Sequence, residues 1–374
     1  MILGILKEKE PERRVAMLPE TVASLVKLKV SVVVEQGAGL TAFAADEAYI
    51  EAGAMVVGRQ VVTSTSDLIL CINPPVDDIA GLHEDKVLMT VLNPYFNTDL
   101  VKVLAKGRIT AFSMDIIPRT SRAQAMDILS SMATVAGYKA VLTAANTLPK
   151  FFPMFMTAAG TITPAKVLIL GAGVAGLQAV ATSRKLGGVV EVFDVRAAVK
   201  EEVMGLGAKF VEVEGASDDK AAGGYAVEQS EEFKQRQAQA IHDHAVKSDV
   251  IICTAQIPGK KAPLLLKADT VKAMKPGSVI IDLAASTGGN CELTQDNATV
   301  VEHGVKIIGN SFFPTDMPTD ASRMFGKNIF NFLKLIINAE GGMNLNWNDD
   351  IVKGTAVTHD GKVVNERVLA MLNN

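Results

Sequence analysis

The sequence predicts an α/β fold made of two doubly wound parallel-sheet domains joined by long helices. Short apolar runs rich in β-branched residues alternate with helical or loop stretches along most of the chain, a pattern typical of parallel strands with crossover helices. A length of 374 residues and a hydrophobic content of 48% allow more than one core to be buried. Two domains are therefore the expected organisation.

The first domain is expected over residues 1–128 together with residues 320–374. Its predicted strands are the apolar runs 2–6, 30–35, 67–73, 87–92 and 109–116. A helix is predicted over 19–27, because this stretch opens with proline, which is favoured in a first helical turn. Residues 355–364 are predicted to form a hairpin around the turn Asp360-Gly361, which completes this domain.

The second domain is expected over residues 129–319. Its predicted strands are 167–170, 189–193, 209–213, 250–254, 279–283 and 305–308. Two long helices are expected where the chain passes from one domain to the other. The first covers residues 121 to about 146 and opens with Ser121-Arg-Ala-Gln124, a candidate capping box. The second covers 319–338, with Thr319 or Asp320 near its cap.

The second domain opens with a Rossmann-like dinucleotide fingerprint, in which a strand leads through G-x-G-x-x-G into a helix. Gly171 allows the tight turn, Gly173 lets the backbone approach a pyrophosphate, and Gly176 lets the helix pack closely on the sheet. The next strand ends at Asp194, where a carboxylate can accept hydrogen bonds from ribose hydroxyls and repel a 2′-phosphate. This arrangement favours NAD(H) over NADP(H), and we interpret Arg196 as a neighbour of the pyrophosphate. A glycine-rich turn in a nucleotide-free sheet is the alternative.

A second polar group lies at the start of the first long helix. Arg119, Gln124, Asp127 and Ser130 fall within twelve residues, and on a helix starting at Ser121 one face would offer a row of hydrogen-bonding groups to a ligand. In the alternative interpretation Gln124 completes a cap, Asp127 favours the first turn through the helix dipole, and Arg119 is a solvated loop charge.

Acid–base pairs are not evident from the sequence. None of the five histidines has an obvious pairing with a serine, cysteine or carboxylate. A dehydrogenase acting on an alcohol or amine needs a positioned base, whereas hydride exchange between two nicotinamides needs orientation and exclusion of water. Amide, carboxylate, hydroxyl and guanidinium groups can supply that orientation.

Composition excludes several other classes of protein. A net charge of −4 and a pI near 5.8 provide no basic field for nucleic acid. The three cysteines lie far apart, without spacing for a disulfide framework or a zinc site, and no metal site is predicted. The N-terminus lacks a secretory segment, and no stretch is expected to reach the roughly 20 apolar residues of a membrane span, so a cytoplasmic location without membrane insertion is expected.

Taken together, these segments resemble the soluble NAD(H)-binding alpha subunit, or first domain, of proton-translocating NAD(P) transhydrogenase. The most specific stretches are 118–131, 170–179, 194–197, 222–226 and 254–260. The resemblance implies that the nicotinamide-side, catalytic residues are Arg119, Gln124, Asp127, Ser130 and Tyr138. It also implies that the cofactor-binding residues are Gly171, Gly173, Val174, Gly176, Asp194, Val195, Arg196, Gly224, Tyr225, Gln237, Ala255 and Gln256. Of these, Gly224 and Tyr225 would lie on a mobile loop, for which an ordinary surface loop is the alternative.

The resemblance further implies a homodimer that works with other polypeptides. NAD(H) would bind to this chain, and NADP(H) would bind only to a partner subunit. Membrane-spanning subunits would couple Re/Si-specific transhydrogenation to proton translocation. The chain would therefore be cytoplasmic, peripheral to the inner membrane through its partners, and active only with them.

Two other functions are alternatives to transhydrogenase. Alanine dehydrogenase shares the architecture and a pattern like Arg14-Val15-Ala16. The segments that carry its lysine, histidine and aspartate read here Cys71-Ile-Asn-Pro74, Val91-Leu-Asn-Pro94 and Ala284-Ala-Ser-Thr-Gly-Gly289. The absence of those groups argues against amino-acid turnover, and Arg14 is then interpreted as a structural relic or a salt-bridge partner. The other alternative is a non-catalytic module that senses NAD(H).

Overall fold

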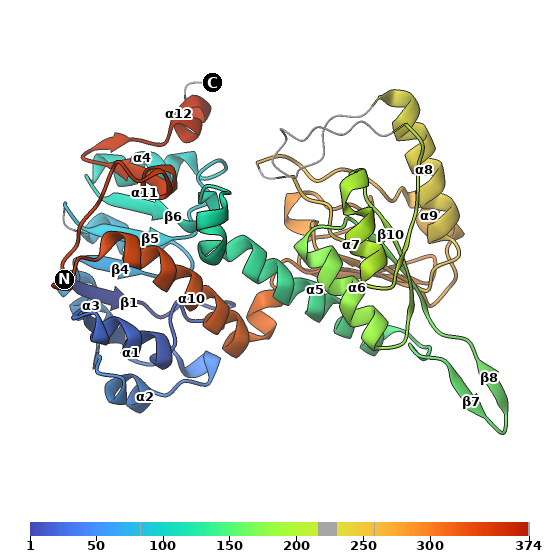
Figure 1. Cartoon of the computed structure of the whole chain (residues 1–374), viewed down its shortest axis with the longest axis horizontal. Coiled ribbons are helices and arrows are strands. Elements are labelled where there is room, and N and C mark those ends of the chain that lie inside the picture. The colour runs from blue at the N-terminus through green and yellow to red at the C-terminus, as the bar shows by residue number, and fades with distance from the viewer. Residues whose placement is uncertain (83, 216–229, 258, 373–374) are drawn as a thin grey trace. The chain divides into compact units, whose positions relative to one another are not determined.

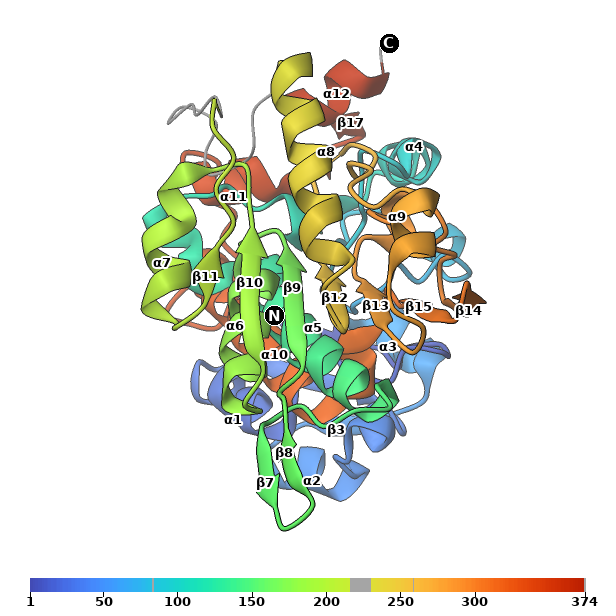
Figure 2. The same cartoon turned by 90° about the vertical axis from the view of Figure 1, so that its right-hand side faces the viewer.

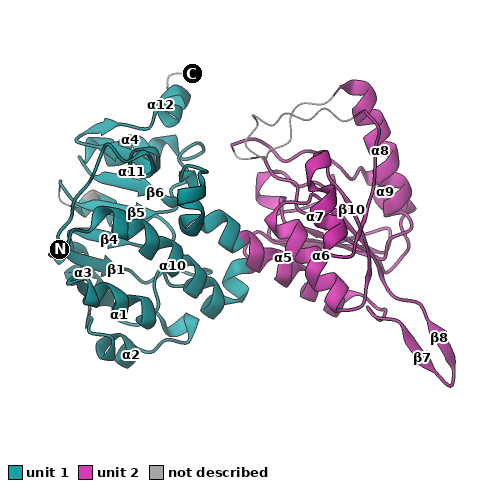
Figure 3. Cartoon of the chain, in the orientation of Figure 1, with its two compact units in different colours: residues 1–132, 314–374 teal, residues 133–313 magenta. Residues whose placement is uncertain are grey.

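The computed structural model describes residues 1–82, 84–215, 230–257 and 259–372 and divides the chain into two compact units (Figure 3). Unit 1 consists of residues 1–132 and 314–374, and unit 2 consists of residues 133–313. Each unit has a mostly parallel sheet with helices on its faces (Figure 1), so the predicted α/β fold class is confirmed.

The sheet of unit 1 is doubly wound. Its strands are β1 (Ile2–Ile5), β2 (Ser31–Glu35), β3 (Met55–Val57), β4 (Leu68–Leu70), β5 (Val87–Thr90), β6 (Thr110–Ser113), β16 (Ala356–His359) and β17 (Lys362–Val363). They lie in the order β17-β16-β6-β5-β4-β1-β2-β3. The order reverses between β1 and β4, which is the topological switch point where such sheets bind ligands.

Helices cover both faces of this sheet. They are α1 (Pro19–Lys27), α2 (Asp46–Glu51), α3 (Arg59–Thr65), α4 (Thr98–Lys106), α10 (Pro318–Ile336), α11 (Asp350–Thr355) and α12 (Glu366–Leu372). Alternate strand residues enter different cores: Leu68 and Leu70 pack with α1 and α10, whereas Ile69 packs with α3, α4 and α12. Successive side chains of a strand point to opposite faces of the sheet, and both faces are covered here. A continuous apolar run therefore forms a strand that is buried on both faces.

Unit 2 has a sheet of the same kind, and Figure 2 shows its strands side by side. Its strands are β9 (Lys166–Leu170), β10 (Val189–Phe193), β11 (Lys209–Phe210), β12 (Val250–Cys253), β13 (Val279–Asp282), β14 (Ala298–Glu302) and β15 (Val305–Gly309), in the order β11-β10-β9-β12-β13-β15-β14. Its helices are α6 (Val174–Lys185), α7 (Lys200–Gly205), α8 (Glu231–Ala245), α9 (Ala268–Ala273) and most of α5 (Ile128–Thr147).

The register of the unit 2 sheet brings three loops together at the edge formed by the carboxyl ends of its strands. Leu170 of β9 pairs with Phe193 of β10 and with Cys253 of β12, all in parallel. Because the carboxyl ends of these strands align, the turns that follow β9, β10 and β12 lie beside one another. These turns carry the fingerprint, Asp194 and the stretch 254–256.

Several elements differ from the expectation of purely parallel sheets. β16 pairs antiparallel with β6 and β17, and β14 pairs antiparallel with β15. The hairpin at 355–364 is confirmed, whereas β3, β14 and a separate hairpin of β7 (Phe155–Thr157) and β8 (Gly160–Ile162) are not predicted from the sequence. These strands are short and largely exposed, so they lack the apolar alternation that identifies the central strands.

One described helix, α5, is long and apolar enough to cross a membrane by length and composition alone. The expectation that no stretch reaches this limit is therefore wrong for α5. Ile128 belongs to the core of unit 1, and Ala140, Val141 and Ala144 belong to the core of unit 2. These buried positions are part of the 33% of the apolar window of α5 that is buried.

Candidate functional site

A pocket of about 300 Å³ lies on unit 1, formed by residues that follow β6. Its lining consists of Ile117, Pro118, Arg119, Thr120, Ser121, Ala123, Gln124, Asp127 and Ser130. Four of the five residues predicted to be catalytic, Arg119, Gln124, Asp127 and Ser130, are thus brought together. Tyr138 lies further along α5 and is not part of this lining.

The backbone around the pocket differs from the single long helix that was predicted. Residues Ser121–Met126 form a 3-10 helix, η4, and Thr120 rather than Ser121 caps it by accepting a hydrogen bond from the N–H of Ala123. The carboxylate of Asp127 then accepts hydrogen bonds from the N–H of Ser130 at 2.9 Å and from its hydroxyl at 2.6 Å. Asp127 therefore caps α5, which begins at Ile128, because a short carboxylate side chain competes well for the free N–H groups of a helix start.

The residues of the pocket therefore have different roles. The predicted capping box at Ser121 is wrong, and Gln124 is not used as a cap: its exposed side chain makes no hydrogen bond to any residue that the structure describes. Arg119 is also exposed at the pocket. The pocket therefore offers an amide and a guanidinium beside a carboxylate–hydroxyl pair, which is a set of orienting groups without a histidine or lysine.

The fingerprint of unit 2 has the strand, turn and helix that were predicted. Gly171 has a φ of +104°, a backbone conformation that side chains rarely adopt. A Cβ atom at Gly176 would overlap the carbonyl oxygen of Gly171, whereas a Cβ atom at Gly173 would meet nothing within 4 Å. The first helical residue of α6, Val174, follows directly and is partly exposed. The turn is thus closed at Gly176 and open at Gly173, where a ligand can approach the backbone.

Asp194 lies at the end of β10 and joins the fingerprint to the following turn. Its carboxylate accepts hydrogen bonds from the N–H of Ala172 at 2.7 Å and from the N–H of Arg196 at 2.8 Å. The guanidinium of Arg196 donates to both carboxylate oxygens, at 2.9 and 2.7 Å. The side chain of Asp194 is only 6% exposed. A pyrophosphate contact of Arg196 stays a prediction, and Val195 packs beside the core of this unit.

The loop after β12 is held by a residue that sequence reasoning missed. The buried amide of Asn290 accepts from the N–H of Ala255 at 3.0 Å and donates to the carbonyl oxygens of Ala255 and Pro263. The carboxylate of Asp282 accepts from the N–H of Asn290 in turn. In the sequence Asn290 only follows two glycines, a pattern that indicates a turn and says nothing of a partner 35 residues away.

The other residues predicted to bind the cofactor lie on the loop after β12, on α8 and outside the described part of the chain. Gln256 is exposed, and its amide donates to the carbonyl oxygen of Leu283 at 2.7 Å. Gln237 is half-buried on α8. Gly224 and Tyr225 lie outside the described residues.

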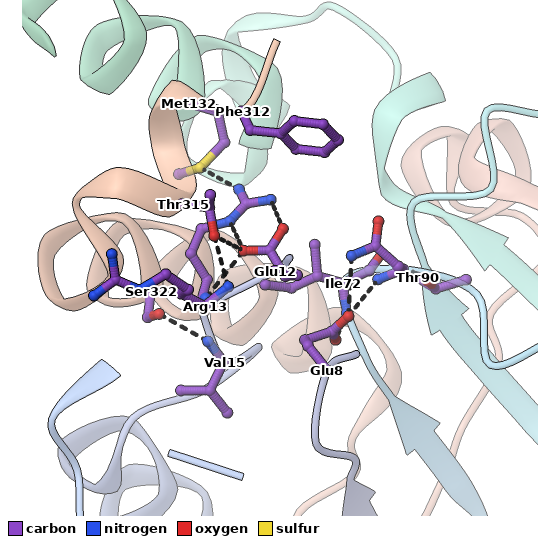
Figure 4. Close-up of polar contacts among 12 residues, drawn as sticks. Glu8, Glu12, Arg13, Val15, Ile72, Thr90, Met132, Phe312, Thr315 and Ser322 are labelled. Atoms are coloured by element: carbon purple, nitrogen blue, oxygen red, sulfur yellow. Dashed lines mark hydrogen bonds and ion pairs between the residues drawn. The ribbon is translucent and has the colours of Figure 1, made fainter. Parts of the chain in front are cut away.

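Arg14 is paired with Glu12 within unit 1. Figure 4 labels Glu12 and Thr315, which take part in the same group of contacts. The guanidinium of Arg14 donates to both carboxylate oxygens of Glu12, at 2.8 and 2.6 Å, and the buried Glu12 also accepts from the hydroxyl of Thr315. Burial alone would raise the pKa of Glu12, but the hydrogen bonds and charge of Arg14 outweigh it, and the pKa lies below its usual value. The interpretation of Arg14 as a salt-bridge partner is confirmed.

Glu8 fills the switch point of the same sheet, at the ends of β1 and β4 (Figure 4). Its carboxylate accepts from the N–H of Ile72 at 2.5 Å and from the N–H and side-chain amide of Asn73 at 3.1 and 3.0 Å. Burial raises the pKa of Glu8, and these three donors offset only part of the rise. In unit 1 the backbone N–H groups at the switch point therefore bind the carboxylate of Glu8. At the corresponding place in unit 2 the backbone beside Gly173 is open, and a phosphate can approach it.

The edge of unit 2, by contrast, fits a dinucleotide. α6 begins directly after Gly173, where a Cβ would meet nothing within 4 Å, and the N–H groups of a first helical turn have no intrahelical partner, an arrangement that suits a pyrophosphate. Asp194 adds a fixed carboxylate at the end of the next strand, the place where ribose hydroxyls are bound in such folds.

Comparisons with known proteins cover almost all of the chain. Residues 4–136 match the family model "Alanine dehydrogenase/PNT, N-terminal domain", and residues 140–366 match "Alanine dehydrogenase/PNT, C-terminal domain". An NAD(P) transhydrogenase subunit alpha polypeptide of Rhodospirillum rubrum is 46% identical over 97% of this chain and 98% of its own length. A crystal structure of transhydrogenase from Sinorhizobium meliloti has a TM-score of 0.89 at 41% identity, covering 97% of this chain and 100% of that one. Alanine dehydrogenase of Bacillus subtilis is 30% identical over 85% of this chain and 81% of its own length.

Proposed function

Because the chain belongs to the alanine dehydrogenase/PNT family and, within it, to the alpha subunits of NAD(P) transhydrogenase, we propose that it is the NAD(H)-binding subunit of a proton-translocating, Re/Si-specific transhydrogenase. NADP(H) binds to a partner subunit, and membrane-spanning subunits couple the reaction to proton movement. The chain itself lies in the cytoplasm, peripheral to the inner membrane through those partners, and is active only with them.

In this proposal the edge of unit 2 holds the cofactor. The N–H groups at the start of α6, with Gly173 and Val174, bind the pyrophosphate, and Asp194 binds the ribose. Arg196 keeps the Asp194 carboxylate oriented through its two bonds. Ala255 and Gln256 border the same edge on the loop that Asn290 holds. Gln237, Gly224 and Tyr225 are assigned to the cofactor through the family alone.

The observation that carries the proposal is the composition of the unit 1 pocket. NAD(H) supplies the hydride when it is bound, and a second nicotinamide as acceptor leaves no substrate proton for a base to remove. Arg119, Gln124, Asp127 and Ser130 orient the nicotinamide by hydrogen bonds, a role that matches a pocket without histidine or lysine. Tyr138 is assigned to this group through the family.

The test is a mixture of the purified chain with a recombinant NADP(H)-binding subunit. We expect reduction of an NADP⁺ analogue by NADH at a rate well above that of either protein alone, because each protein holds only one of the two nicotinamides. A mixture no faster than its separate components contradicts the proposal. Rapid NAD⁺ reduction by L-alanine without a partner would instead identify an amino-acid dehydrogenase. NADH binding without either activity would identify a sensing module.

We assign the homodimer contact to the hairpin of β7 and β8, which projects from unit 2 (Figure 2). Its apolar side chains are exposed in the single chain, with Met156 at 77%, and Phe155 of the hairpin packs against Phe151. Exposed apolar groups that gather on one projecting element mark a protein contact, because water is a poor environment for them. A second copy of this chain is the partner that the proposal requires.

Replacing Phe155 and Met156 by serine should weaken this dimer at least about tenfold, because each buried apolar side chain contributes roughly 1.5–3 kcal/mol. Sedimentation velocity over a concentration series measures the effect. Phe43→Ser is the matched control, since Phe43 is 79% exposed on unit 1 and its loss should leave the dimer intact. A wild-type monomer, or a hairpin variant that dimerises like the wild type, contradicts the assignment.

A further inference from the structure

Two asparagines of α10 hold the segment that carries Gln124 and Asp127. The side-chain amides of Asn328 and Asn331 both donate to the carbonyl oxygen of Ala125, at 2.9 and 3.0 Å. The two asparagines are three residues apart and therefore lie on the same face of α10. Ala125 directly follows Gln124, so this shared carbonyl is an attachment point next to a residue that lines the pocket.

A second attachment lies on the other side of Gln124. The guanidinium of Arg122 donates to both carboxylate oxygens of Asp349, at 2.7 and 2.6 Å. Asp349 is itself fixed, because it caps α11 by accepting from the N–H groups of Ile351 and Val352. The segment is therefore tied on both sides of Gln124 to the C-terminal part of unit 1.

The segment itself forms only one short 3-10 helix. η4 spans only Ser121–Met126. At its start the N–H of Ala123 donates to the Thr120 carbonyl at 3.0 Å, but at its end the bond from the Asp127 N–H to the Gln124 carbonyl is long, at 3.4 Å. Short 3-10 turns are weak because their hydrogen bonds are poorly aligned and their nucleation is costly. The contacts to α10 and to the cap of α11 therefore add restraints that a short 3-10 turn by itself lacks.

Stability alone does not explain Asn328. Its side chain is buried, with 8% of the residue exposed, yet its amide oxygen has no hydrogen-bond partner among the described residues. A buried acceptor without a donor destabilises a fold, and an apolar residue of similar size would avoid that cost. An apolar residue could not supply the N–H donor that the Asn328 side chain provides to the Ala125 carbonyl oxygen.

We propose that Asn328 and Asn331 are positioning residues, which fix the carbonyl of Ala125 so that Gln124 and Asp127 keep the pose needed for transhydrogenation. The proposal rests on the function proposed above. Neither asparagine lines the pocket, and both act only through the backbone of the segment.

The test compares Asn328→Leu, Asn331→Leu and the double variant in the full chain, with Lys327→Leu as a control for leucine at an exposed position of α10. Hydrogen exchange of residues 118–127 is measured without any partner, beside NADH affinity, thermal stability and the rate with the NADP(H)-binding subunit. We expect faster exchange in this segment and a rate at least about tenfold lower in the double variant, since a 1 Å misplacement can cost about a hundredfold. NADH affinity should stay within about threefold.

Two further results separate positioning from a structural role. Asn328→Leu should be as stable as the wild type or more stable, and Asn331→Gln, which keeps an NH₂ donor, should retain most of the rate. Wild-type exchange and rate in the double variant overturn the proposal, as do losses of stability and NADH affinity that parallel the loss of rate. If the wild type shows no transhydrogenation, the proposed function fails, while exchange in 118–127 still decides whether the asparagines hold the segment.

Discussion

Gly176→Ala should weaken NADH binding by roughly tenfold to a hundredfold, the loss expected when a hydrogen bond to a charged group, worth about 1.5–3 kcal/mol, is displaced. The added Cβ would overlap the carbonyl oxygen of Gly171, and both atoms belong to the fingerprint. Because the obstacle is backbone, α6 must move away from the turn, and its free N–H groups move with it. Overpacking of this kind also costs about 1–3 kcal/mol of stability. Isothermal titration with NADH and thermal unfolding measure the two effects.

Two other glycines make the comparison specific. At Gly173 an added Cβ meets nothing within 4 Å, so Gly173→Ala should fold like the wild type and still bind NADH more weakly, because the methyl group stands where the pyrophosphate approaches. At Gly205, at the end of α7, the space is also open, and Gly205→Ala should leave NADH affinity unchanged. Wild-type NADH affinity in Gly176→Ala would show that α6 does not hold the cofactor.

Asp127→Asn should lower the transhydrogenation rate by about tenfold to a hundredfold while changing NADH affinity by less than about threefold. Asparagine caps a helix as well as aspartate does, so the start of α5 at Ile128 should survive. What is lost is the negative charge beside the hydroxyl of Ser130 at the pocket. Steady-state kinetics with the NADP(H)-binding subunit, beside direct titration of NADH, separates the two quantities.

Asp194→Ala should have the opposite effect to Asp127→Asn: it should lower NADH affinity rather than the rate. The carboxylate lies at the predicted ribose site, and a hydrogen bond to a charged group contributes about 1.5–3 kcal/mol, so NADH affinity should fall roughly tenfold to a hundredfold. The rate at saturating NADH should change much less. Gln124→Asn should behave like Asp127→Asn, because Gln124 also lies at the pocket. Equal losses of affinity in all three variants would contradict the division between binding and orientation.

Much of the fold follows from local signals. α1 and β10 have the predicted limits, because a proline-led helix start and a β-branched run between turns are written in neighbouring residues. β3 and β14 were missed because they lie at the edges of their sheets, where burial no longer imposes an apolar pattern. The start of α5 was misplaced because Ser121 and Asp127 are both good caps, and local sequence cannot decide between them.

The candidate site divides in the same way. The order of glycines and Asp194 in the fingerprint, and the grouping of Arg119, Gln124, Asp127 and Ser130, can be recognised in the sequence because each set is nearly contiguous. The restraints on these groups come from distant residues. Asn290 reaches Ala255 from 35 positions away, and Asn328 reaches Ala125 from 203.

By itself, the sequence determined the α/β class, the family and the chemical groups available to a dinucleotide, because these depend on the order of residues along the chain. Only the tertiary structure decided that Arg14 is bound by Glu12, that Asp127 rather than Ser121 caps α5, and that α10 holds the carbonyl of Ala125. The physical reason is that a buried polar group must find a partner wherever packing brings one within about 3 Å, and that partner can come from any stretch of the sequence.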